Sequence, residues 1–136
     1  MNRNASVFIV DDDDAVRSSL RLLLKSVGLP AMAYASAGDF LAAWHPSQAG
    51  CLVLDVRMPG MSGIELQHEL NRRGAIIPVI FISGASTTRE TVLAMKAGAH
   101  EFLAKPVASK VLVEAIESAL VKHRMLLHDA ARRARA

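Results

Sequence analysis

Five short hydrophobic runs alternate along the chain with longer stretches of helical periodicity. The runs occupy residues 7–10, 31–34, 52–54, 79–82 and 102–104. Short strands that alternate with helices favour an α/β domain whose parallel sheet is covered on both faces, and solid apolar runs are what burial on both faces requires. The weaker run at residues 31–34 is expected at an edge of the sheet. We therefore predict a doubly wound, five-stranded parallel sheet with five helices.

The intervening stretches carry recognisable helix signals. In the first, residues 14–27, apolar side chains recur with the spacing of one helix face, and the stretch stops at Gly28. Three further starts show Ser or Thr with an acidic residue three positions later, the pattern of a capping box or its Asp variant. These pairs are Ser36 with Asp39, Ser62 with Glu65, and Thr87 with Glu90, and they predict helices over residues 37–45, 63–73 and 87–97. A fifth helix is expected from about Ser109.

Acidic residues follow two of the predicted strands. Asp11, Asp12, Asp13 and Asp14 close the first run, and Asp55 closes the third. Parallel strands place their C-terminal ends at one edge, and ligands of doubly wound sheets bind there, where the strand order reverses. Carboxylates gathered at one point repel each other unless a cation lies among them, and hard oxygen ligands suit Mg²⁺. Asp13 and Asp14 are instead expected to cap the first helix and to meet the positive end of its dipole.

Length and composition limit the classes of protein. A chain of 136 residues, half of them hydrophobic and about one fifth charged, fits one globular domain. No apolar run approaches the roughly 20 residues that cross a membrane, and the N-terminus lacks the order of a signal peptide, which predicts a cytoplasmic protein with no membrane partner. The single cysteine, Cys51, is expected to be a small buried hydrophobe rather than a nucleophile.

The positive charge is concentrated at the C-terminal end. Residues 122–136 hold five basic residues and one acidic residue, a net +4, which leaves residues 1–121 at −1 of the total of +3. A basic segment of this kind either contacts nucleic acid or is a solvated helix or linker. Leu120, Leu127 and Ala134 fall seven apart, so the last helix is expected to extend past the domain as an amphipathic stalk. We predict a domain at residues 1–121 and a helical extension or linker at 122–136.

Four stretches in order resemble the receiver domain of two-component response regulators. They are VDDDDAVR at residues 10–17, LDVRMPGMSGIEL at 54–66, PVIFISGA at 78–85 and AMKAGAHEFLAKP at 94–106. With their connecting elements they cover residues 6 to about 121. Each is weak alone, but together they fall on the predicted strand ends. The resemblance implies a flavodoxin-like sheet with strand order 2-1-3-4-5.

The resemblance also implies roles for the acidic residues. Asp55 corresponds to the family's phosphoacceptor, whose carboxylate attacks a phosphoryl group in line and forms an acyl phosphate. Asp11 and Asp12 correspond to the acidic pair that binds Mg²⁺, with Asp55 and the backbone carbonyl of Arg57 as further oxygen ligands. The simpler alternative for Asp55 is an aspartate that caps the next turn.

Three other residues match switch or catalytic positions of the family. Lys105, whose bond to Pro106 the family holds cis, is expected to pair with Asp55 and then with a phosphoryl oxygen. Ser83 matches the hydroxyl that donates to the phosphoryl group, and Phe102 matches the aromatic residue that moves inward with it. An ordinary surface lysine, and a serine that satisfies a local backbone group, are the alternatives.

Arg57 lies two positions after Asp55, where aspartate-based phosphatases carry a second aspartate as general acid. Its presence argues against a hydrolase, so we expect a switch that gains and loses its own phosphoryl group rather than a turnover enzyme. We further hypothesise that Arg57 and the small Ala85 tune the access of water to the acyl phosphate. A solvated arginine is the alternative. The five histidines have no metal-site spacing, so phosphate is expected from a partner's histidine.

The amino-acid sequences of these motifs resemble those of regulators of the NarL/FixJ type, in which a DNA-binding helix-turn-helix follows the receiver. Within 136 residues no such domain follows, so the chain is read either as a receiver cut in its linker or as a single-domain regulator. The expected partners are a sensor histidine kinase, a second copy bound through the fourth helix, fifth strand and fifth helix, and DNA only through an absent output domain. The alternative is an interaction module that phosphorylation does not regulate.

Overall fold

Five parallel strands form the centre of the molecule. The structure is a computed structural model that describes residues 5–135. The strands are β1 Ser6–Val10, β2 Ala31–Tyr34, β3 Gly50–Asp55, β4 Val79–Ser83 and β5 Glu101–Ala104. They lie in the order β2-β1-β3-β4-β5, and every neighbouring pair is parallel. The predicted fold class and strand order are therefore confirmed.

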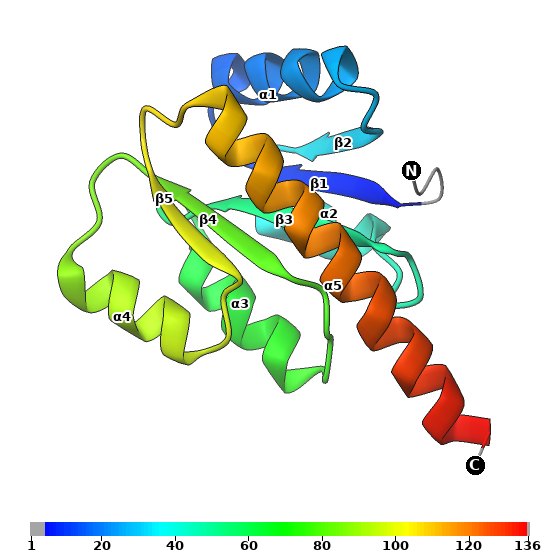
Figure 1. Ribbon diagram of the computed structural model, residues 1–136. Coiled ribbons are helices and arrows are strands. Elements are labelled where there is room, and N and C mark those ends of the chain that lie inside the picture. The colour runs from blue at the N-terminus through cyan, green and yellow to red at the C-terminus, as the bar shows by residue number, and fades with distance from the viewer. Residues whose placement is uncertain (1–4, 136) are drawn as a thin grey trace.

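Five helices cover the two faces of this sheet. They are α1 Asp14–Ser26, α2 Ala37–Ala43, α3 Gly63–Arg72, α4 Thr88–Lys96 and α5 Ser109–Arg135. Helices α1 and α5 pack on one face, whereas α2, α3 and α4 pack on the other (Figure 1). Each of the first four helices is joined to the next strand by a short connection, which is the arrangement that a doubly wound sheet requires.

The alternation of side chains in β3 divides the core into two layers. Cys51 and Val53 point into the cluster beneath α1 and α5, and Leu52 and Leu54 point into the cluster beneath α2 and α3. All four side chains are almost completely buried. Successive side chains of a strand face opposite sides, so a strand covered on both faces has to be apolar throughout. The weaker run that forms β2 lies at an edge, as predicted.

The helix starts follow the predicted capping patterns. Asp13 caps α1 and accepts hydrogen bonds from the N–H groups of Ala15 and Val16. Complete capping boxes begin α3, through Ser62 and Glu65, and α4, through Thr87 and Glu90. These boxes satisfy N–H groups that no helical carbonyl can reach. Helices α3 and α4 end within one residue of the predicted ends at residues 73 and 97, and the glycines that follow, Gly74 and Gly98, have φ angles of 72° and 103°.

The second helix is shorter than predicted. It ends at Ala43, and Trp44 adopts an extended backbone with ψ of 142°. The predicted end at residue 45 was wrong because Pro46 disfavours the helical conformation of His45, the residue before it.

The last helix continues far past the sheet. Helix α5 runs unbroken for 27 residues, and its C-terminal part projects away from the domain (Figure 1). The predicted helical extension is present over residues 122–135, while residues 1–4 of the predicted domain and residue 136 lie outside the described part. Among residues 5–135, no helix has the length and apolar character needed to cross a membrane.

Candidate functional site

Three carboxylates gather at the C-terminal edge of the sheet, where the chain leaves the neighbouring strands β1 and β3 toward helices on opposite faces. Asp11 follows β1 directly, Asp12 is next to it, and Asp55 is the last residue of β3. One oxygen from each of the three lies within 4.8 Å of the others. Asp11 is 1% exposed and Asp55 is 7% exposed, whereas Asp12 faces solvent. The strand order thus brings together the three residues that the sequence placed at one edge.

Lys105 brings the positive charge into this cluster. Its ammonium nitrogen lies 3.4 Å from Asp11 Oδ2 and 3.8 Å from Asp55 Oδ1. The residue follows β5, and its N–H donates to the Ser83 carbonyl at 2.8 Å, which fixes the start of the side chain. The bond from Lys105 to Pro106 is cis, as the sequence predicted. The predicted pairing of Lys105 with Asp55 is present.

The environment of Asp55 opposes its negative charge. Burial raises the pKa of its carboxyl group, and the neighbouring Asp11 raises this pKa further. Lys105 and the N–H of Arg57, which lies 3.5 Å from Asp55 Oδ1, lower it again. A buried carboxylate is stable only when nearby positive charge offsets the loss of water. Lys105 therefore helps to keep Asp55 ionised.

The donor set fits a hard divalent cation. Three carboxylates face one ammonium group, so the cluster carries an excess of negative charge and offers only oxygen ligands. Mg²⁺ is bound through one or two carboxylates together with water and substrate phosphate, which suits a shallow site with one exposed acid. Asp11, Asp12 and Asp55 are the residues that could hold it. The backbone of Arg57 lies beside them, as its hydrogen bond to Asp55 indicates.

The loop after Asp55 is folded closely against the end of β3. The N–H of Gly63 donates to the Val56 carbonyl at 3.0 Å, and a Cβ atom at Gly63 would lie 2.2 Å from the Asp55 carbonyl oxygen. Only a residue without a side chain fits this close approach. Sequence reasoning did not identify this role of Gly63.

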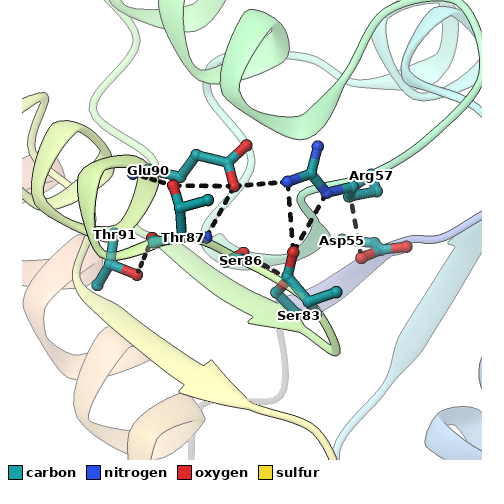
Figure 2. Close-up of polar contacts among 8 residues, drawn as sticks. Asp55, Arg57, Ser83, Ser86, Thr87, Glu90 and Thr91 are labelled. Carbon is teal, nitrogen blue, oxygen red and sulfur yellow. Dashed lines mark hydrogen bonds and ion pairs between the residues drawn. The ribbon is translucent and has the colours of Figure 1, made fainter.

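Ser83 ends β4 beside this cluster and is 4% exposed. Its oxygen accepts a hydrogen bond from the Ser86 hydroxyl at 2.5 Å and a weak one from the Ala85 N–H at 3.4 Å (Figure 2). The register pairs Asp55 with Ile82, the residue before Ser83, so the serine lies one position beyond Asp55 at the same edge. Its hydroxyl is engaged by the loop that follows β4.

Phe102 lies on the edge strand β5 and is only partly buried. Its ring packs against Phe81 of β4, with ring centres 5.6 Å apart. An aromatic side chain at the border of the core can repack without opening the sheet, so this position suits the predicted movement. The placement alone leaves the switch role a prediction.

The side chain of Arg57 leaves the acidic cluster and crosses to the segment after β4. Its guanidinium donates to the Ala85 carbonyl and to Glu90 Oε1, the latter at 2.7 Å (Figure 2). Arg57 is thus paired rather than freely solvated. Sequence reasoning identified Arg57 and Ala85, and it identified Glu90 only as a capping residue. The contacts of Glu90 with Arg57 and of Ser86 with Ser83 were not predicted, because neither residue type carries a signal for such a partner.

Cys51 is a residue of the core, as predicted. It is completely buried, and burial raises the pKa of its thiol to about 12.

His123 is also fully buried, and its Nδ1 accepts a hydrogen bond from the Gly50 N–H at 3.0 Å. This structural role was not predicted, because basic residues surround His123 in the sequence.

Comparisons with known proteins agree with this arrangement. Residues 7–117 match the family model of the response regulator receiver domain. The transcriptional regulatory protein FixJ of Azorhizobium caulinodans is 47% identical over 88% of this chain and 57% of its own length. Nodulation protein W of Bradyrhizobium diazoefficiens is 46% identical over 88% of this chain and 53% of its own. The chain therefore spans about half the length of these curated relatives.

Solved structures give the same result. The response regulator StyR superposes with a TM-score of 0.88 at 46% identity, over 97% of this chain and 66% of the StyR chain. The structure titled FixJ-N superposes with a TM-score of 0.80 at 43% identity, over 88% of this chain and 95% of that one. The family match spans most of the chain, and the acids and the lysine lie together at the edge where the fold binds ligands. The chain belongs to the receiver domain family of response regulators.

Proposed function

We propose that the chain is a phosphorylation-driven switch in which Asp55 accepts a phosphoryl group from a sensor histidine kinase. The observation that carries this proposal is the convergence of Lys105, Asp11 and Asp12 on the one carboxylate that ends β3. A nucleophilic carboxylate needs positive charge beside it, both to remain ionised and to stabilise the transferring phosphoryl oxygens.

In the proposed transfer, a carboxylate oxygen of Asp55 attacks the phosphorus of a phosphohistidine in line. The new O–P bond forms as the P–N bond breaks, and the imidazole leaves with the electron pair. Lys105 pairs with a phosphoryl oxygen from its position 3.8 Å from Asp55 Oδ1. Mg²⁺ bound by Asp11, Asp12, Asp55 and the Arg57 carbonyl would neutralise charge on the transferring oxygens.

The proposed response to phosphorylation involves β4 and β5. Ser83 releases Ser86 and donates its hydroxyl proton to the phosphoryl group, and Phe102 repacks against Phe81. A phosphoryl group need only bind the two arrangements of the domain with different affinity to shift their populations. Reversal by hydrolysis of the acyl phosphate makes this a self-resetting switch and not a turnover enzyme.

The surface of α4, β5 and α5 is the proposed site of a homodimer. Exposed apolar side chains lie on its two helices: Val92, Leu93 and Met95 on α4, and Val111 and Val121 on α5. The relatives are longer than this chain, and the name of FixJ describes a transcriptional regulatory protein. We accordingly propose that an output domain, DNA-binding as in a transcription factor, acts with this receiver. Control of transcription would place the chain in the cytoplasm.

One experiment separates the candidate functions. Acetyl phosphate, or beryllofluoride as a mimic, is added with and without Mg²⁺, and Asp55→Asn is the control. Stoichiometric labelling that needs Mg²⁺ and Asp55 supports the switch. Sustained release of phosphate would instead support a hydrolase, and no response by the intact protein would support an interaction module that phosphorylation does not regulate. Residue 57 is an arginine, whereas aspartate-based phosphatases carry a second aspartate at this position, and this difference argues against the hydrolase.

A further inference from the structure

One carboxylate oxygen of Glu90 accepts hydrogen bonds from two different parts of the chain. As the third residue of α4, it closes the capping box, because its Oε1 accepts the Thr87 N–H at 3.0 Å. The same oxygen accepts a hydrogen bond from Nη2 of Arg57 at 2.7 Å (Figure 2). Arg57 belongs to the loop after β3, so this contact connects the loop that carries Asp55 with the start of α4.

The guanidinium of Arg57 also binds the loop between β4 and α4. Its Nε and Nη2 lie 3.4 and 3.3 Å from the Ala85 carbonyl oxygen. On the other side of this loop, the Ala85 N–H and the Ser86 hydroxyl both donate to the oxygen of Ser83. The loop is therefore held from two sides, by a cation at its carbonyl and by the Ser83 oxygen at its donors.

This arrangement competes with a phosphoryl group on Asp55. In the proposed switch, Ser83 turns from Ser86 toward the phosphoryl group, and this turn breaks the hydrogen bonds that its oxygen accepts from Ser86 and Ala85 in the present form of the loop. A phosphoryl group also adds a charge of about −1.5 to −2 close to Arg57, and this charge competes with Glu90 for the guanidinium. Contacts that stabilise the present form must therefore weaken the binding of a phosphoryl group.

We propose that Glu90 is a positioning residue that holds Arg57 against the Ala85 carbonyl, so that the pair braces the unphosphorylated form of the β4–α4 loop. The brace sets how readily Ser83 turns to the phosphoryl group. This inference rests on the proposed function, since it concerns the response of the same site. It extends the hypothesis that Arg57 and Ala85 control access to the acyl phosphate by naming the acid that positions the arginine.

The test removes the charge of Glu90 but keeps its capping oxygen. Glu90→Gln is compared with the intact protein for the affinity for beryllofluoride in the presence of Mg²⁺, measured by titration calorimetry. Because the side chains of Arg57 and Glu90 are 57% and 26% exposed, the gain is expected to be modest, about two- to fivefold tighter binding. Without beryllofluoride, the thermal stability of Glu90→Gln should equal that of the intact protein or lie below it. Tighter binding would then not come from a more stable fold.

Helix α3 offers a matched control. Glu65 closes the capping box of α3 with the Ser62 N–H at 2.9 Å, and it makes no ion pair with an arginine among residues 5–135. Glu65→Gln loses the same charge in the same local structure, and it should leave the beryllofluoride affinity unchanged. An equal gain in both variants would overturn the proposal, because it would show a general effect of capping charge.

A double-variant cycle tests the pairing itself. Arg57→Gln removes the pair but also the cation that the phosphoryl group attracts, so it should not tighten beryllofluoride binding as Glu90→Gln does. Glu90→Gln added to the Arg57→Gln variant should then have no further effect on the affinity. A gain from Glu90→Gln that is the same with and without Arg57, or weaker binding by Glu90→Gln alone, would contradict the brace. If the unaltered protein fails to bind beryllofluoride, the proposed function itself is wrong. If it binds and Glu90→Gln does not tighten binding, only the brace is wrong.

Discussion

The ammonium nitrogen of Lys105 lies 3.8 Å from Oδ1 of Asp55, although their strands are separated in the sheet by β4. The lysine stem passes Gly84, where a Cβ atom would lie 3.9 Å from Lys105 Cδ. The same ammonium lies 3.4 Å from Asp11. One cation thus serves two buried carboxylates, and its removal would leave both without a charged partner among the described residues.

Replacement of Lys105 with Met should slow the phosphorylation of Asp55 at least about tenfold. Met keeps most of the length of the unbranched side chain but removes the charge that lowers the pKa of Asp55. Without this charge the pKa of Asp55 would rise further, so that its carboxylate would become protonated at a higher pH, and the phosphoryl oxygens would lose a partner. The rate of labelling by acetyl phosphate, measured over a range of pH, tests this. Lys110→Met, on the exposed start of α5, should match the intact protein, and an equal rate for both variants would rule out the assigned role.

Removal of Mg²⁺ should destabilise the domain through the acidic cluster. A ligand that binds only the folded state adds about 2.7 kcal/mol to the free energy of unfolding at 100 times its Kd. Asp12→Asn removes the exposed acid of the cluster, so most of this Mg²⁺-dependent gain should disappear. Thermal unfolding with Mg²⁺ and with EDTA measures the gain. Asp129→Asn, on the α5 extension, should keep it in full, whereas an unchanged gain in Asp12→Asn would place the metal elsewhere.

The sequence predicted the acidic cluster because its members depend on topology alone. Asp11 and Asp55 directly end apolar runs, and parallel strands align their C-terminal ends whatever the details of the loops. Lys105 also follows an apolar run, the fifth, but its expected pairing with Asp55 came from the resemblance to the receiver domain. For a given strand order, a residue that directly follows the C-terminal end of a central strand lies at the site.

The contacts around the loops could not be predicted in this way. The pairing of Arg57 with Glu90, and of Ser83 with Ser86, depends on the path of two loops, which no periodicity specifies. The close approach of Gly63 to Asp55 could not be predicted either, because it also depends on the path of the loop after β3. Sequence patterns identify elements and their ends, whereas side-chain pairs between loops require coordinates.

Replacement of Gly63 with Ala should destabilise the protein and disturb the site. The new Cβ would lie 2.2 Å from the Asp55 carbonyl oxygen, so the end of β3 or the start of α3 has to move. Overpacking of this kind costs about 1–3 kcal/mol, and movement of Asp55 should also slow its phosphorylation. Gly38→Ala is the matched control, because its nearest atom would be 3.9 Å away and alanine favours the helix. Equal stability of Gly63→Ala and the intact protein would contradict the close approach.

His123 connects the α5 extension to the start of β3. Its Nδ1 accepts the Gly50 N–H at 3.0 Å, and its Nε2 has no hydrogen-bond partner among the described residues. Burial lowers the pKa of His123. Protonation would also remove the lone pair that accepts the Gly50 N–H. The buried imidazole is therefore suited to the neutral form, and its titration should affect the stability of the folded domain.

The free energy of unfolding should consequently fall as the pH drops below the ordinary histidine pKa of about 6.5. Since the pKa is lower in the folded state, the unfolded chain binds more protons in this range, and acid favours unfolding. His123→Asn retains an acceptor for Gly50 but cannot titrate, so it should lose less stability than the intact protein between pH 7 and pH 5. Denaturant unfolding at each pH measures the difference. Burial also lowers the pKa of His100, but this residue is present in both proteins and its contribution cancels. Parallel stability curves for the two proteins would show that His123 does not couple protonation to folding.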